Sequence, residues 1–479
     1  MDPEKILLHS RYNPRAEADR YINSLSLNES IRFIVLIEPG LGYINAPLKK
    51  KYPAAKIITL HAEDFSGIKT QEPAPDSEWN PGKGISVQEF LEREIPDSGA
   101  GEIKMLEWRP ALAVYGKTYL SLVEETVGFI KLADANAKTI KAFGRRWFRN
   151  FLKNTCLVKT ALCPASFPIP VVVTGAGPGL ESAMPLIREQ AGRSKLFVLA
   201  AASSVMCLEA GNISPDMVIS TDGGNWASLH LGECCRGGKY LKSNRIFPIA
   251  VSMTAALPSQ CEEMAILPIA DGSVWQAVIL DKLGIPFITL PQRGTVSASA
   301  LDLAFSLTSG SIYIAGMDLA NNDICSHARP YSFNRLLEEK AVRLNPVYSQ
   351  TFKRSSLLKA GGSYSIYASW FEKQLGSYPK PLLPIGKNNP LFIAPEEHIN
   401  INAVSGSENS FANSRLVSVK NTNASNLPAE VLEKTLSGSS PLSAKIFEEL
   451  ASLLFPGNAG VSKTELINTI RSLGGKGKS

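Results

Sequence analysis

The sequence predicts an α/β protein with a mostly parallel β-sheet, and three observations support this prediction. Short apolar runs rich in β-branched residues alternate with amphipathic segments through the middle of the chain. Several of these runs end in glycine-rich or polar turns. The 479 residues are 44% hydrophobic and 20% charged, an ordinary globular composition with enough chain for two or three domains. The alternation favours a sheet that helices cover on both faces.

A small N-terminal α/β domain is predicted over residues 1–110. Its expected elements are a polar helix, a strand, a short helix, a second strand and a helix: 14–27, 33–37, 46–51, 56–60 and 86–95. Gly40 and Gly42 follow the first strand, and Glu63 and Asp64 follow the second. Two interpretations stay open, a nucleotide-type pocket with one acid on a ribose hydroxyl and a scaffold without a ligand.

A helical connector is predicted over 111–165, because the stretch 117–153 contains few helix-breaking residues. The aromatic residues at 147–151 lie at its end, and their spacing is typical of core packing. Three prolines in 163–170 then indicate a domain boundary.

The central domain is predicted over 166–345. Seven apolar runs separated by helical segments are its expected strands: 171–174, 195–199, 217–221, 246–251, 264–269, 286–290 and 311–315. If the strands are parallel, their carboxyl ends meet at one edge of the sheet. Ligands of open α/β sheets bind at that edge, so the turns that follow these strands are the candidate site.

A C-terminal extension, 346–479, is predicted to be partly helical. Its expected helices are short and amphipathic: 364–375, 428–436, 441–454 and 462–473. Residues 379–390 are rich in proline, and the Asn- and Ser-rich stretch 402–426 is expected to be mobile.

Charge and cysteine usage exclude several classes of protein. The formal net charge of +6 is mild over this length, so no nucleic-acid partner is called for and a small anionic ligand fits as well. The seven cysteines form no CxxC pair, so we predict no metal site, and we also predict no cofactor. We expect no signal peptide, and the longest apolar run, 196–208, is too short for a membrane span. We therefore expect a cytoplasmic protein.

The glycine-rich turn at 175–179, Gly-Ala-Gly-Pro-Gly, is the first candidate site segment. It links the strand at 171–174 to a helix. Strand, glycine turn and helix together present backbone N–H groups to a phosphate, which predicts ligand contacts for Gly175, Gly177, Pro178 and Gly179. A tight turn without a ligand is the alternative.

Three further segments follow other strands of the predicted sheet. Ser203 either caps the next helix or bonds a ligand. Asp222 and Gly223 offer an acid that holds Mg²⁺ or a ribose hydroxyl, or caps a turn. At a helix start, a cation and hydroxyl groups form an anion site: Arg293, Gly294, Thr295 and Ser297.

Asp318 and His327 are the candidate catalytic residues. Asp318 follows the last predicted strand, and His327 lies nine residues further on. An imidazole beside an acid at the edge of a sheet is a plausible general base, although a histidine in a loop is often a bystander.

Four segments occur in the order found in one family: GAGPGLES, AAASSVMCLEAGNISPDMVISTDGG, RGTVSASALDLA and IAGMDLANNDICSHA. In this order the chain resembles the motility-associated factor (Maf) glycosyltransferases, over about two thirds of its length. Their shared domain is named after an archaeal 6-hydroxymethylpterin diphosphokinase, MptE-like, and is also similar to bacterial sialyltransferases. The resemblance implies a Rossmann-like, sialyltransferase-like central domain, a small Rossmann-like N-terminal domain and a helical C-terminal region.

The resemblance also implies a function. The expected reaction is transfer of a nonulosonic acid, of the pseudaminic or legionaminic type, from its CMP-activated form to Ser or Thr of flagellin. By position, the implied CMP-sugar contacts are Gly175, Gly177, Pro178, Ser203, Asp222, Gly294 and Asp318. His327 matches the family's histidine. Gly179 and Ala202 depart from the Ser and Asn that relatives often carry, and Thr295, Ser297 and Ser299 offer hydroxyls where sialyltransferases use tyrosines.

Two alternatives come from other classes. One is diphosphoryl transfer from ATP to a pterin alcohol, with Asp222 and Asp318 holding Mg²⁺. The other is a non-catalytic flagellin-binding protein built on a decayed transferase fold. Metal dependence distinguishes the first alternative from sugar transfer, and flagellin binding without turnover would favour the second.

Overall fold

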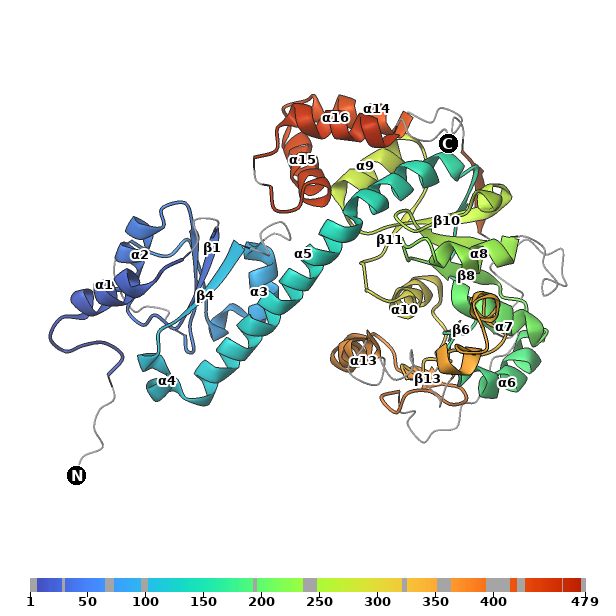
Figure 1. Ribbon diagram of the computed structural model, residues 1–479, viewed down its shortest axis with the longest axis horizontal. Helices are drawn as coiled ribbons and strands as arrows, with labels where there is room; N and C mark the ends of the chain where they lie inside the picture. Colours follow the sequence, from blue (N-terminus) through green and yellow to red (C-terminus); the bar gives the residue numbers. More distant parts are fainter. Residues whose placement is uncertain are drawn as a thin grey trace. The chain divides into compact units, whose positions relative to one another are not determined.

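The computed structural model describes most of the chain (Figure 1). The described residues are 7–27, 31–64, 73–95, 102–192, 196–235, 248–320, 325–350, 363–392, 414–419, 427–458 and 460–474. Contacts divide the chain into two compact units. The first contains 1–144 and 450–461, and the second contains 145–449 and 462–479.

The first unit is built on a four-stranded parallel sheet. In spatial order its strands are β3 (Ser77–Trp79), β2 (Lys56–Leu60), β1 (Phe33–Ile37) and β4 (Ile103–Glu107). The helices of this unit are α1 (Pro14–Ser24), α2 (Asn45–Lys51), α3 (Val87–Glu94), α4 (Pro110–Tyr115) and the first part of α5 (Lys117–Leu157). All five residues of β1 are buried, as expected for a central parallel strand covered on both faces.

The second unit contains a ten-stranded sheet among the described residues. In spatial order its strands are β13 (Leu382–Pro384), β12 (Ile312–Ala315), β6 (Val171–Thr174), β7 (Phe197–Ala201), β8 (Met217–Ser220), β9 (Ile249–Ser252), β10 (Ala265–Ala270), β5 (Thr160–Cys163) and β14 (Arg415–Ser418), with β11 (Ile288–Thr289) beside β10. Every strand pair is parallel except β14 with β5. The predicted α/β class with a mostly parallel sheet is therefore confirmed.

The strand order of this sheet reverses at β6. The chain steps from β6 through β7 and β8 to β9 and β10, and later returns to place β12 on the other side of β6. Figure 1 shows α6 (Leu180–Gly192), α7 (Val205–Ala210) and α8 (Ala227–Cys235) on one side of the sheet and α10 (Val296–Leu307) on the other. The carboxyl ends of β6 and β12 thus flank the topological switch point, where open α/β sheets bind ligands.

The remaining helices of the chain are α9 (Val274–Lys282), α11 (Asn334–Glu339), α13 (Ser363–Gln374), α14 (Leu427–Leu436), α15 (Pro441–Leu454) and α16 (Lys463–Gly474). At the end of α5, Phe148 and Phe151 are fully buried against Trp275 of α9, with ring centroids 5.5 and 4.6 Å apart. The core position expected for the aromatic residues of this segment is thus confirmed for Phe148 and Phe151, whereas Trp147 is half-buried.

Two expectations for the C-terminal region differ from the structure. The proline-rich stretch 379–390 contains β13, because its apolar residues 382–384 extend the sheet beside β12. Within 402–426, expected to be mobile, residues 415–418 form β14, which pairs with β5. The rest of that stretch lies outside the described residues, apart from 414 and 419.

Candidate active site

The glycine turn after β6 is bonded to the loop that follows β12. The amide of Gly175 donates to the carbonyl of Ala315 at 2.8 Å, and that of Gly177 donates to Gly316 at 2.9 Å. The amide of Gly179 donates to both carboxylate oxygens of Asp318, at 2.9 and 3.0 Å. Three amides of the turn thus have partners within the protein. The anion at the start of α6 is the chain's own carboxylate.

Close packing explains why this turn needs glycine. A Cβ on Gly177 would collide with the Asp318 carboxylate and the Gly316 carbonyl. A Cβ on Gly179 would collide with the Lys387 carbonyl. The tight-turn interpretation therefore accounts for these glycines without a ligand, and ligand contacts of Gly175, Gly177, Pro178 and Gly179 stay a prediction.

Asp318 is fixed from three sides. Besides accepting from Gly179, its backbone carbonyl accepts from the Asn389 side chain at 3.0 Å, and Asn388 accepts from the Met317 amide at 3.0 Å. Burial raises the pKa of Asp318, although the hydrogen bond from Gly179 acts in the opposite direction. A carboxylate that is held in this way is better placed to position the two loops than to exchange protons with a substrate.

His327 lies in a segment that returns to the glycine turn. The amide of the next residue, Ala328, donates to the carbonyl of Ala176 at 2.9 Å. The His327 Nδ1 atom lies 2.9 Å from the Ser326 hydroxyl, and its ring stacks on Tyr331 with centroids 3.9 Å apart. These contacts fix the orientation of the imidazole. The structure therefore brings His327, Asp318 and the glycine turn to one edge of the sheet, as the sequence predicted.

The same edge carries an aromatic cluster that the sequence analysis did not predict. It contains Trp226, His230, Tyr331 and Phe333, in addition to His327. His230 packs on Phe333 with centroids 4.7 Å apart, and its Nδ1 atom lies 3.0 Å from the Ser332 hydroxyl. Burial lowers the pKa of His230 to about 4, with the charge of Asp222 acting in the opposite direction.

Trp226 stands at the outer end of this cluster. Its side chain is 62% exposed, and it meets the Phe333 ring edge-on with centroids 6.0 Å apart. The Lys340 ammonium lies 5.8 Å from the indole centroid. The sequence signal was a tryptophan in a turn of glycine and asparagine, outside any apolar periodicity. Exposed aromatic faces of this kind stack on sugars and bases.

The predicted serine and acid behave differently from each other. Ser204 is buried and bonds to Thr174, whereas the neighbouring Ser203 is half-buried and has no hydrogen bond from its side chain to another described residue. Asp222 is exposed and accepts the Gly224 amide at 2.7 Å, which favours the turn-capping alternative.

Gly223 has a structural role that the sequence did not reveal. A Cβ at this position would collide with the indole of Trp147 on α5. Its carbonyl accepts from the Asn150 side chain at 3.2 Å, and the same amide group donates to the Thr254 carbonyl at 3.0 Å. Gly223 thus packs against the helical connector, and its ligand contact stays a prediction.

Arg293 is bound by the protein. Its guanidinium donates to both carboxylate oxygens of Asp302, at 2.6 and 3.3 Å, and lies 5.6 Å from the Trp370 ring centroid. Asp302 is on α10 itself, so the cation predicted at this helix start is paired with an acid of the same helix. The partner acid lies nine residues further along the chain, a spacing that the sequence analysis did not single out, and a ligand contact of Arg293 stays a prediction.

The start of α10 keeps part of its predicted character. Thr295 accepts the Ala298 amide at 3.1 Å and so caps the helix. Gly294 is exposed with φ +67° and open space around it. The Ser297 side chain has no hydrogen-bond partner in the described parts of the chain. Because α10 follows β11 and packs on β6 and β7, it begins at the same carboxyl edge.

The carboxyl edge of the first unit is filled by the chain itself. Glu38, fully buried with φ +46°, accepts the amides of Gly40 at 3.3 Å and Ala62 at 2.5 Å. Leu8 and His9 occupy the space that a Cβ on Gly40 would need. This covering favours the scaffold interpretation over a nucleotide-type pocket.

No group of three or more His, Cys, Asp or Glu side chains within the described residues is arranged to hold a metal ion. None of the helices they form is long and apolar enough to cross a membrane.

Part of the second unit is similar to a known protein family, and the chain has a relative among known proteins. Residues 145–323 match the family model described as 6-hydroxymethylpterin diphosphokinase MptE-like. An uncharacterized protein of Treponema pallidum (strain Nichols) is 28% identical over 288 residues. The aligned region covers 60% of this chain and 60% of that relative's length.

A solved structure shares the fold. The Maf glycosyltransferase from Magnetospirillum magneticum AMB-1 superimposes with a TM-score of 0.56 at 10% identity, covering 97% of this chain and 86% of that one. Residues 145–323 are therefore similar to an MptE-like domain, and the chain shares the fold of a solved Maf glycosyltransferase.

Proposed function

We propose that this chain is a glycosyltransferase that moves a nonulosonic acid of the pseudaminic or legionaminic type from its CMP-activated form to Ser or Thr of flagellin. The observation that carries the proposal is the convergence of His327, Ser203 and the exposed aromatic ring of Trp226 at the switch-point edge of a Maf-type fold. We place the reaction in the cytoplasm, in keeping with the unpatterned cysteines.

The proposed mechanism is direct displacement. The acceptor hydroxyl oxygen forms a bond to the anomeric carbon of the sugar, the bond from that carbon to the phosphate oxygen breaks, and CMP leaves with the electron pair. His327, whose ring is oriented by Ser326 and Tyr331, takes the hydroxyl proton. Asp318 acts as a positioning residue, because its oxygens accept the amide of Gly179.

In this proposal the leaving phosphate binds at the start of α10. Gly294 leaves open space there, and the Ser297 hydroxyl is available among the described residues to donate a hydrogen bond. Arg293 contributes to this site only if it leaves Asp302, so we assign it a supporting role at most. Neither a cofactor nor a metal enters the proposed reaction.

A donor-binding experiment tests the proposal. CMP, added to the purified chain, is expected to raise the melting temperature, whereas ATP with Mg²⁺ is not. Intact-mass analysis of flagellin incubated with the chain and a CMP-nonulosonate is expected to reveal the added sugar mass. Stabilisation by ATP–Mg²⁺ alone would favour the diphosphokinase alternative. Flagellin binding without any added mass would favour the non-catalytic one.

A further inference from the structure

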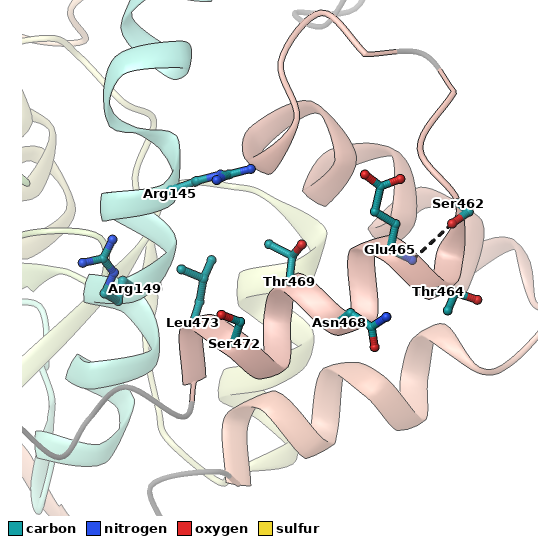
Figure 2. Close-up of a pocket in the computed structure, with 9 residues that line it drawn as sticks. All are labelled: Arg145, Arg149, Ser462, Thr464, Glu465, Asn468, Thr469, Ser472 and Leu473. Carbon is teal, nitrogen blue, oxygen red and sulfur yellow. Dashed lines mark hydrogen bonds between the residues drawn. The ribbon is translucent and has the colours of Figure 1, made fainter.

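The second unit contains a pocket that belongs to none of the loops described above. It has a volume of about 640 Å³ and lies between the last part of α5 and α16 (Figure 2). Small-molecule sites typically measure roughly 300–1,000 Å³. Of the side chains that line this pocket, only Leu473 is apolar. A pocket of this size with a polar wall suits a small hydrophilic ligand.

Two arginines on α5 supply its positive wall. Arg145 and Arg149 are four residues apart on α5 and both line the pocket; in Figure 2 the Arg145 guanidinium extends toward α16, whereas that of Arg149 points the other way. An anion bound in the pocket would be attracted by both positive charges. The guanidinium of Arg149 has no hydrogen-bond or ion-pair partner among the residues that the structure describes. This wall therefore favours an anion such as a phosphate group.

The opposite wall consists of hydrogen-bonding groups on α16. Glu465, Asn468, Thr469 and Ser472 recur at helical spacing and line the pocket. The backbone amide of Glu465 donates to the Ser462 hydroxyl oxygen at 3.1 Å (Figure 2), and the Glu465 side chain is exposed. A carboxylate beside an amide and hydroxyls accepts hydrogen bonds from the hydroxyl groups of a sugar but repels a bare anion.

We propose that this pocket binds a small phosphorylated sugar, with the phosphate on Arg145 and Arg149 and the sugar hydroxyls on Glu465 and Asn468. The two walls differ in sign, so the ligand must be anionic at one end and hydroxyl-rich at the other. This site is separate from the proposed transferase site, since its lining includes no residue of the carboxyl edge.

Ribose 5-phosphate is a suitable probe for the full chain, with binding followed by titration calorimetry at neutral pH. We expect millimolar or tighter binding to the wild type and at least about tenfold weaker binding to R149Q. The matched control is R146Q, which removes the same charge from the neighbouring residue outside the pocket lining and should keep the wild-type affinity. Melting temperatures of the variants check that each has folded.

A second pair of measurements tests the sugar end. The E465Q variant should bind ribose 5-phosphate more weakly than the wild type. Its affinity for inorganic phosphate should be unchanged or higher, because the substitution removes a negative charge that repels the anion. Three results would each overturn the proposal. The wild type does not bind ribose 5-phosphate, R149Q and R146Q lose affinity equally, or inorganic phosphate binds as tightly as ribose 5-phosphate. No donor or acceptor of the proposed transferase reaction takes part, so the two proposals fail independently.

Discussion

Two parallel sheets in this molecule carry the same motif at their carboxyl edges but fill those edges differently. In both, a glycine-containing turn after an interior strand bonds to a carboxylate of the chain, Glu38 in the first unit and Asp318 in the second. In the first unit Leu8 and His9 cover the turn, and the Trp108 indole donates to the Leu8 carbonyl at 2.9 Å. The motif alone therefore does not identify a ligand site.

The second edge keeps polar and aromatic side chains that are partly exposed. His327 and Ser203 are half-buried there, and Trp226 is largely exposed. The difference lies in the segments that cross each edge. A chain segment fills the first edge with an imidazole and an aliphatic side chain, whereas the second edge is lined by loops that hold each other. The following experiments test whether this difference decides function.

The largest expected effect is on folding. Gly177→Ala forces a Cβ into a backbone carbonyl and a fixed carboxylate, and we expect it to destabilise the second unit by roughly 3 kcal/mol or more. The matched change Gly40→Ala meets only the side chains of Leu8 and His9, although at φ +59°, and should cost about 1–2 kcal/mol. Hydrogen exchange resolved by peptide separates the two units. A larger loss from Gly40→Ala would contradict the comparison.

The next effect is on turnover. His327→Ala should lower the rate of sugar transfer by roughly 10²–10⁴-fold with little change in CMP-sugar affinity, because a general base contacts the acceptor. His9→Ala, at the covered edge of the first unit, should leave turnover unchanged and is the control. If a folded His327→Ala variant transfers sugar at the wild-type rate, His327 has no catalytic role and only packs on Tyr331.

A smaller effect concerns pH. Burial lowers the pKa of His230 from 6.5 to about 4, so its neutral form is favoured in the folded state. The unfolded chain then binds more protons, and the stability of the second unit should fall as pH decreases from about 6.5 to 4, by up to about 3 kcal/mol. His230→Gln should reduce this fall. The midpoint of urea unfolding, compared at pH 7 and pH 5 for both proteins, provides the measurement.

The smallest effect is expected from metal removal. Asp222 caps its own turn, and Asp318 accepts from Gly179, so neither is arranged with the other as a metal site within the described residues. EDTA should therefore leave sugar transfer unchanged. Activity that disappears with EDTA and returns with Mg²⁺ would assign metal binding to this edge and contradict the proposed mechanism.

Much of the fold could be predicted from the sequence because its signals are local. Seven expected strands correspond to β6 through β12, and the helices near 364–375, 428–436, 441–454 and 462–473 are confirmed as α13 to α16. Each depends on the spacing of apolar residues within one segment. The strand β13 was missed because three apolar residues among prolines carry no periodicity.

The site depended on partners that only the tertiary structure selects. The turn at 175–179 was visible in the sequence, but Asp318, which accepts the Gly179 amide, lies 139 residues away. Arg293 was visible as a cation, yet Asp302 neutralises it, and the cluster of His230, Tyr331 and Phe333 forms only when α8 meets the loop before α11. By itself, the sequence determined the elements and the edge at which they end. Tertiary packing decided which polar groups are used internally and which stay exposed, because a buried donor or charge takes whichever partner the fold brings near.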